Sequence, residues 1–414
     1  MMPRRVVVTG LGMVTPLGTG VAKNWEAVCA GKSGIGTITK FDASGFASQI
    51  AGEVTDFRPQ DFLAKQQIRR FDVFIHYALA STRMAMEDAD LKINQKNAHR
   101  VGCVTGSGLG GLGMLEHYHS VLLEKGPKRI SPFFIPGIIA NMAPGQMAIE
   151  FGAKGPNISI ETACAASAHA VGEAFRYIRE GFADIMLTGG AESVITPLAV
   201  GGFCSMRALS TRNDAPEKAS RPFDLNRDGF IIGEGAGILI LEELEYALER
   251  GAPIYGEVVG YGLTGDAYHV SAPEPEGAGA IACMKGALDF AGLKPQDIDY
   301  INAHGTSTQL NDASENKAIK AVFKEHAYKL SISSTKSVTG HLLGVAGGIE
   351  SVFSLLTIKH GVIPPTMNYE TPDPECDLDY VPNVARKSPV RTAMSNSFGF
   401  GGTNASLIFA AYEN

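Results

Sequence analysis

The chain contains two successive series of strand-like segments, and helix-like segments separate the strands in both series. The first series is RRVVVTG, RVGCVTGSG, NISIETAC and ADIMLTGG; the second is PIYGEVVGYG, DYINAHGTST, LSISSTKSVTGH and ASLIFAAY. Alternating strands and helices predict an α/β fold. Because the two series run in a similar order, we expect an internal duplication into halves 1–251 and 252–414. The segments 54–72, 108–150 and 200–230 fit neither series and are expected to form insertions or loops.

A cysteine, Cys164, lies between a predicted strand and a predicted helix in NISIETACAASAHA, residues 157–170. Apolar residues at spacings of three, four and three predict one face of the helix: Ala168, Val171, Phe175 and Ile178. Cys164 would then lie near a helix N-terminus, where free N–H groups and the helix dipole stabilise a thiolate. This stretch alone favours neither a nucleophile nor a small buried core residue.

Two histidines occupy comparable positions in the second half. His304 follows the strand-like DYIN, and His341 ends TKSVTGH, just before the next predicted helix. The carboxyl ends of strands form the edge at which α/β sites assemble, so we expect the thiol and both imidazoles to meet there. Lys336 lies five residues before His341 and Glu350 nine after it. Taken alone, such a lysine is more often a solvated charge.

Composition narrows the class of protein. The 414 residues include 45% hydrophobic residues, and the net charge of −7 argues against general nucleic-acid binding. Six cysteines show no paired or zinc-binding spacing and no secretory signal precedes them, which predicts reduced thiols and a cytoplasmic location. No apolar run approaches the ~18 residues of a membrane span.

Two glycine-rich runs could bring backbone N–H groups close to a ligand. GSGLGG (106–111) fits the dinucleotide pattern G-x-G-x-x-G, but no acidic ribose partner ends a strand about twenty residues later. The alternative that the chain is an NAD-binding oxidoreductase therefore depends on this run alone. FGFGGTN (398–404) lies too near the C-terminus to open a dinucleotide unit. Beside Cys164, such a loop could supply oxyanion donors.

Together, the motifs TGSGLGG, TAC, GGAE, RPFD, RDGF, NAHGTST, SSTKSVTGHLLG and NSFGFGGTN resemble those of the β-ketoacyl-acyl carrier protein synthases. The resemblance spans essentially the whole chain and is strongest to the synthase II class. It implies the thiolase fold, with two βαβαβαββ halves in five α/β/α/β/α layers. It also implies decarboxylative condensation of an acyl group with malonyl-acyl carrier protein in fatty-acid elongation, without a redox cofactor or catalytic metal.

The resemblance assigns roles residue by residue. Cys164 matches the acyl-accepting nucleophile, His304 and His341 match the decarboxylation histidines, and Lys336 matches the lysine that supports them. Phe400 matches a gating residue whose N–H joins that of Cys164 in the oxyanion hole. Thr306 and Thr308 match the threonines that contact pantetheine, and Glu350 matches a buried acid. The acyl-pocket residues beside Phe400 are Leu109, Phe134, Ile135, Phe203 and Leu343.

Three further expectations concern assembly and binding. Some family members hold a structural cation beside the acid, which here would lie near Asn302, Glu350, Ser395 and Asn396. In a homodimer, Phe134 and Ile135 of each subunit would close the other subunit's acyl pocket. Basic side chains suited to docking an acidic carrier protein are Lys65, Arg69, Arg70, Lys125, Lys128, Arg129 and Arg207.

Several alternatives differ from this interpretation in one feature each. Leu109 and the QLND that follows NAHGTST depart from the usual pattern, which leaves open a specialised polyketide-like or aryl-polyene ketosynthase. A synthase I also stays open, and a cysteine hydrolase would use the same residue types. A non-catalytic chain-length partner would lack Cys164, a synthase III would have Asn at His341, and a thiolase needs a cysteine beyond Cys376.

Overall fold

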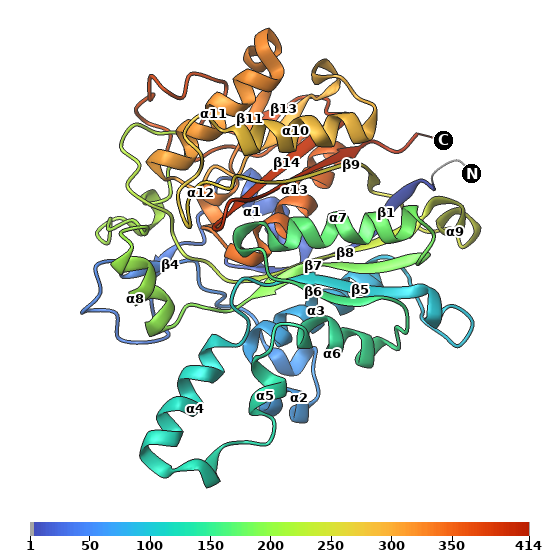
Figure 1. Ribbon diagram of the computed structural model, residues 1–414, viewed down its shortest axis with the longest axis vertical. Coiled ribbons are helices and arrows are strands. Elements are labelled where there is room, and N and C mark those ends of the chain that lie inside the picture. The colour runs from blue at the N-terminus through green and yellow to red at the C-terminus, as the bar shows by residue number, and fades with distance from the viewer. Residues whose placement is uncertain (1–3, 414) are drawn as a thin grey trace.

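In the computed structural model, which describes residues 4–413, the strands of both halves join in one 11-stranded mixed sheet (Figure 1). The first half runs in the order β6-β5-β7-β8-β1 and the second in the order β11-β10-β14-β15-β9. Both orders are 3-2-4-5-1 when each strand is numbered within its own half. The first-half strands are β1 (Val6–Thr15), β5 (Val101–Gly106), β6 (Asn157–Ile160), β7 (Ile185–Glu192) and β8 (Gly235–Glu243). The second-half strands are β9 (Gly256–Gly265), β10 (Tyr300–Asn302), β11 (Ser331–Ser333), β14 (Thr392–Gly399) and β15 (Thr403–Ala410).

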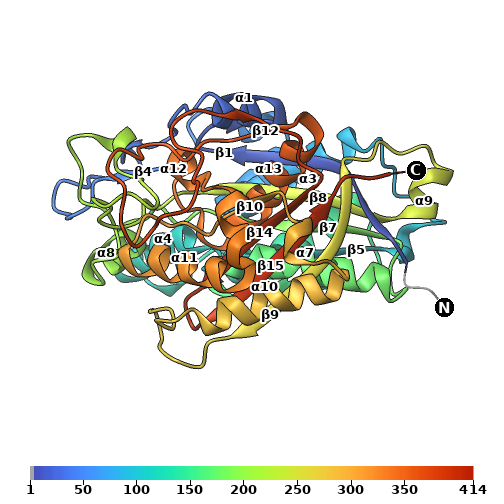
Figure 2. The same ribbon diagram turned by 90° about the horizontal axis from the view of Figure 1, so that it is seen from above.

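The two half-sheets join where β1 pairs with β9, at Val7–Glu257 and Val8–Gly256. Two helices, α7 (Ala166–Arg179) and α13 (Ala346–His360), lie between the half-sheets and contact strands of both. The outer faces are covered by α3 (Val73–Asp88) and α6 (Met142–Phe151) on one side and by α10 (Ala278–Ala291) and α11 (Gln309–Phe323) on the other (Figures 1 and 2). The predicted five-layer duplicated fold is confirmed.

The central helix α7 shows how the sequence pattern leads to the fold. All four residues of its predicted apolar face are buried, and Gly181, at φ +82°, follows the end of the helix. Its other residues are also largely buried, because α7 contacts two sheets rather than one. Small residues such as Ala168, beside which Gly347 of α13 packs, let the two central helices approach closely.

The segments outside the repeated core carry further elements, most of which are short. They are α1 (Val21–Cys29), α2 (Lys65–Arg70), α4 (Leu112–Lys125), α5 (Phe134–Ile138), α8 (Pro197–Ser205), α9 (Leu244–Glu249) and α12 (Lys336–Thr339). Short strands pair as β1 with β2 (Gly18–Thr19), β3 (Gly36–Thr37) with β4 (Ile50–Ala51), and β12 (Val362–Ile363) with β13 (Arg386–Lys387). The expectation of insertions or loops over 108–150 is wrong for α6, which packs on α3 and β5 as part of the core.

Two observations bear on the setting of the chain. All six cysteines are free. Within residues 4–413, no helix combines the length and apolar character that crossing a membrane requires.

Candidate active site

Cys164 lies in a tight turn, Ala163–Ala165, that connects β6 to α7. Ala163 has φ +48°, a left-handed conformation that costs a non-glycine residue roughly 1–2 kcal/mol. The second half repeats this geometry: the turn Leu343–Val345 precedes α13, and Leu343 has φ +49°. The duplication therefore extends to the turn, and Gly344 occupies the position that Cys164 occupies in the first half.

The two predicted histidines lie in the same cavity as Cys164, which has a volume of about 600 Å³. His304 follows β10, and its backbone N–H donates to Glu315 Oε1 at 2.8 Å. His341 is held by backbone bonds to the first half, since its N–H donates to Ile231 O at 2.7 Å. The two imidazole centroids lie 5.4 Å apart with their planes at 86°. One thiol from the first half and two imidazoles from the second thus share one cavity.

Both imidazoles are neutral at physiological pH. Burial, together with the nearby Lys336 ammonium, holds the pKa of His304 and of His341 well below the ordinary value. Each ring has a buried Nδ1 without a hydrogen-bond partner among the described residues. Each neutral ring can still donate one N–H, which suits stabilisation of a developing negative charge.

The predicted stabilisation of a Cys164 thiolate is outweighed in the structure. Burial raises the pKa of the thiol to about 12, although the Lys336 ammonium and the N–H groups of Phe400 and Cys164 lower it. The resting side chain is therefore a thiol.

Lys336 and Glu350 form an ion pair behind the cavity. Lys336 begins α12 and is 1% exposed, and its Nζ contacts the fully buried carboxylate of Glu350 on α13. Neither residue lines the cavity, so Lys336 acts on Cys164 and the histidines through its charge.

The predicted cation site stays a prediction, and two of its four residues are shown to be neighbours. Asn302 of β10 pairs in register with Ser395 of β14. Both polar side-chain atoms of Asn302 and Oε2 of Glu350 are buried without a hydrogen-bond partner among the described residues.

The other predicted site residues fall into two groups. The residues that line the cavity with Cys164 and the histidines are Leu109, Phe203, Arg207, Thr306, Thr308, Leu343 and Phe400. The residues that lie elsewhere are Phe134 and Ile135 on α5, and Lys65, Arg69, Arg70, Lys125, Lys128 and Arg129 on α2, at the end of α4 and in the turn after it. Ile135 is 58% exposed, and the contribution of Phe134 and Ile135 to a neighbour's pocket stays a prediction.

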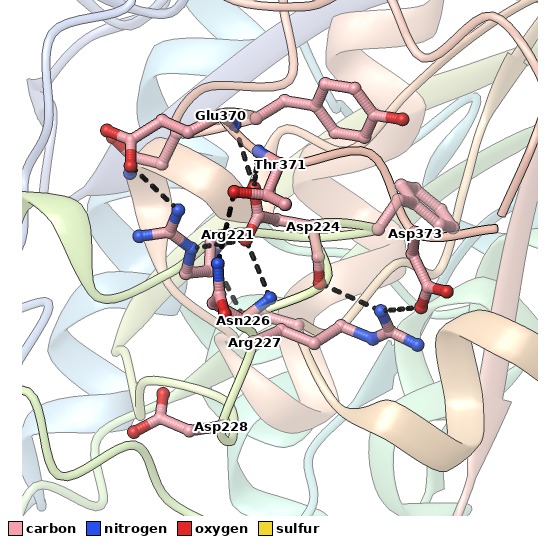
Figure 3. Close-up of polar contacts among 12 residues, drawn as sticks. Arg221, Asp224, Asn226, Arg227, Asp228, Glu370, Thr371 and Asp373 are labelled. Atoms are coloured by element: carbon pink, nitrogen blue, oxygen red, sulfur yellow. Dashed lines mark hydrogen bonds and ion pairs between the residues drawn. The ribbon is translucent and has the colours of Figure 1, made fainter. Parts of the chain in front are cut away.

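Sequence reasoning missed the residues that hold the cavity walls. Arg227, in RDGF, is buried and donates to the carbonyl oxygens of Thr308 and Gln309, both at 3.1 Å. Figure 3 shows it beside Asp224, whose carboxylate accepts from Arg221 Nε at 2.9 Å. Glu192 and Glu315 are buried acids that accept backbone N–H groups of the cavity loops. The motifs GGAE, RPFD and RDGF were the only sequence indication of this support.

Comparisons with known proteins agree with this geometry. The family models "Beta-ketoacyl synthase, N-terminal domain" and "Beta-ketoacyl synthase, C-terminal domain" match residues 3–247 and 255–370. Proteins of Coxiella burnetii and of Synechocystis sp., each named 3-oxoacyl-[acyl-carrier-protein] synthase 2, are 55% identical over 410 residues, which is 99% of each chain. One solved structure is that of a type II PKS acyl-carrier protein in complex with its ketosynthase bound to the hexaketide. The matching chain of that structure is 38% identical to this chain, with a TM-score of 0.90 and 100% of both chains covered.

A duplicated five-layer fold that brings a thiol and two neutral imidazoles into one cavity defines a condensing enzyme of the thiolase-like class. Such enzymes are acyltransferases. The chain belongs to the beta-ketoacyl synthase family. The family and the condensing activity predicted from the sequence are thereby confirmed.

Proposed function

We propose that the chain is a 3-oxoacyl-[acyl-carrier-protein] synthase that transfers an acyl group to Cys164 and condenses it with malonyl-acyl carrier protein. The observation that carries this proposal is the shared cavity, in which the Cys164 thiol lies with the neutral imidazoles of His304 and His341. The relatives named 3-oxoacyl-[acyl-carrier-protein] synthase 2 support fatty-acid elongation as the pathway.

In the first half-reaction, Cys164 Sγ attacks the thioester carbonyl of the acyl donor and loses its proton. The carbonyl oxygen becomes an oxyanion, to which the N–H groups of Cys164 and Phe400 donate. One such donor is worth about 2.7–4 kcal/mol in other enzymes. The C–S bond to pantetheine then breaks, and the pantetheine sulfur leaves with a proton. The acyl group stays on Cys164 and extends into the apolar part of the cavity.

In the second half-reaction, malonyl-acyl carrier protein loses its carboxylate as CO₂. The electron pair of the broken C–C bond forms an enolate at the thioester, and the N–H groups of His304 and His341 stabilise its oxygen. The enolate carbon attacks the acyl carbonyl, and the C–S bond to Cys164 breaks. Protonation of the released sulfur restores the thiol and leaves a 3-oxoacyl product. Thr306 and Thr308, whose hydroxyls lie 2.9 Å apart, would bind the pantetheine arm.

The proposal includes the partners. The carrier protein docks on the exposed basic residues of α2 and of the turn after α4, together with Arg207 at the cavity mouth. A second copy of the chain pairs along β6, which is an edge strand with Ile158 40% exposed, and contributes Phe134 and Ile135. Six free thiols support a reducing, cytoplasmic setting.

The test separates the two half-reactions. Cys164→Ala should abolish acyl-enzyme, measured by mass spectrometry of the intact protein, yet retain CO₂ release from malonyl-acyl carrier protein. His304→Ala or His341→Ala should accept the acyl group and lose CO₂ release. Cys204→Ala and His76→Ala are matched controls outside the cavity lining. If folded Cys164→Ala still forms a stable acyl-enzyme, or if wild-type enzyme releases free acid without condensing, the proposal fails.

A further inference from the structure

Glu192, the last residue of β7, has a fully buried carboxylate that no described Lys or Arg pairs with. Its four hydrogen bonds come from two turns that are far apart in sequence. Oε2 accepts from Gly108 N at 2.5 Å and from Gly344 N at 3.3 Å. Oε1 accepts from Ser107 Oγ at 3.2 Å and from Leu109 N at 3.3 Å.

The duplication explains why an acidic side chain lies there. Burial raises the pKa of the Glu192 carboxyl to about 7, although its four hydrogen bonds favour the ionised form. The fourth strand of the second half, β14, leads to Phe400, whose N–H reaches the Cys164 turn of the first half. The fourth strand of the first half, β7, ends at Glu192, which reaches the Gly344 turn of the second half. Glu192 thus receives one N–H from the turn before the central helix of the second half and three donors from residues 107–109 of the first half.

The two turns that Glu192 joins each contribute a leucine to the cavity wall. Leu109 and Leu343 both line the cavity beside Cys164. Leu109 follows Gly108 and Leu343 precedes Gly344, and the N–H groups of both glycines donate to Glu192. The turns are in direct contact, since a Cβ at Gly344 would overlap the backbone at Gly108 and lie 2.7 Å from Glu192 Oε2. A shift of the carboxylate would therefore move both leucines.

We propose that Glu192 is a positioning residue for acyl-chain selection, because its carboxyl group bridges residues 107–109 and the Gly344 turn and fixes Leu109 and Leu343 relative to each other. This inference rests on the proposed function. Glu192 does not touch the reacting atoms, so its removal should loosen the wall of the acyl pocket without removing the nucleophile or the enolate site.

The test uses Glu192→Gln, which keeps the shape of the side chain. In either orientation of the amide, its nitrogen takes the place of a carboxylate oxygen that accepts at least one backbone N–H, so at least one such hydrogen bond is lost. We expect the ratio of kcat/KM for long over short acyl-acyl carrier proteins to change by about tenfold, the scale of apolar pocket discrimination. Glu53→Gln is the matched control, since Glu53 also accepts from backbone N–H groups, those of Thr39 and Lys40 at 2.9 and 3.2 Å, outside the cavity lining.

A second arm tests the carboxyl group of Glu192 itself. Glu192→Ala leaves its donors unpaired, and sodium formate should restore both the chain-length ratio and the melting temperature, whereas sodium chloride at equal ionic strength should not. If Glu192→Gln does not fold, Ser107→Ala removes one donor and gives the same readout in milder form.

An equal loss of kcat/KM for acyl donors of all lengths in Glu192→Gln, or equal effects of formate and chloride on Glu192→Ala, would overturn the inference. Acylation of wild-type enzyme and of Glu53→Gln is measured in the same series. If neither is acylated the proposed function fails, and if both are acylated while the ratio in Glu192→Gln is unchanged only the role of Glu192 fails.

Discussion

The buried ion pair between Lys336 and Glu350 allows stability and catalysis to be separated. Lys336→Met keeps much of the side-chain volume but leaves the fully buried Glu350 carboxylate without its partner. Removing one member of a buried pair typically costs about 3–5 kcal/mol, a large part of the 5–15 kcal/mol that usually stabilises a folded protein. Replacing both members by apolar residues is often neutral. Lys336→Met/Glu350→Leu should therefore recover most of the lost stability.

Catalysis should not recover with stability, because the double variant still lacks the positive charge near Cys164, His304 and His341. That charge lowers the pKa of the thiol and of both imidazoles. Urea unfolding gives the stability of each variant, and CO₂ release from malonyl-acyl carrier protein gives the activity. If Lys336→Met is as stable as the wild type, the reasoning about the pair is wrong. If the double variant regains decarboxylation, Lys336 has only a structural role.

Three further predictions follow from the cavity, the basic surface and the histidines. Leu109→Phe shrinks the acyl pocket, so kcat/KM across donors of increasing length should shift toward short chains by about tenfold; an unshifted series places the pocket elsewhere. Charge reversal at Arg69 and Arg129 should raise KM for carrier-bound donors and flatten its salt dependence, while reversal of the exposed Lys387 should change neither. The pKa of His341 is depressed by burial, so the unfolded chain takes up its proton first and stability falls as pH drops below ~6.5. His341→Asn should remove up to ~1.4 kcal/mol per pH unit of that slope in urea titrations, and an identical slope would contradict a neutral buried ring.

Local patterns predicted the elements that an apolar run or an apolar period marks in the sequence. The face of α7 and the strands β7 and β9 lie where their apolar residues indicate. Two core strands were not predicted. β14 reads TAMSNSFG, and its buried Ser395, Asn396 and Ser397 break the apolar alternation that marks a strand. β8 reads GAGILILEE and runs directly into α9, so no turn residues separate its apolar run from a helix-like segment.

Some residues of the candidate site could likewise be predicted from the sequence, and others could not. Cys164, His304 and His341 were predictable because each follows a strand-like segment, and the carboxyl ends of strands form the edge at which α/β sites assemble. Glu192 was not, because the groups that it binds lie 83 to 152 residues away in the chain and no local spacing relates them. The acidity of Cys164 also could not be read from the sequence, since burial outweighs the helix N-terminus only once the second half covers the turn.

The way the two half-sheets join has a consequence for the order of the chain. Arg5, just before β1, donates to the backbone oxygen of Glu413, just after β15, at 3.4 Å, so the described ends lie side by side. The connection between the halves, from the end of α9 at Glu249 to the start of β9 at Gly256, includes exposed Gly251 and Pro253. A circular permutant that links the ends and opens at this connection would cut no strand. It should fold with the histidine half preceding the cysteine half.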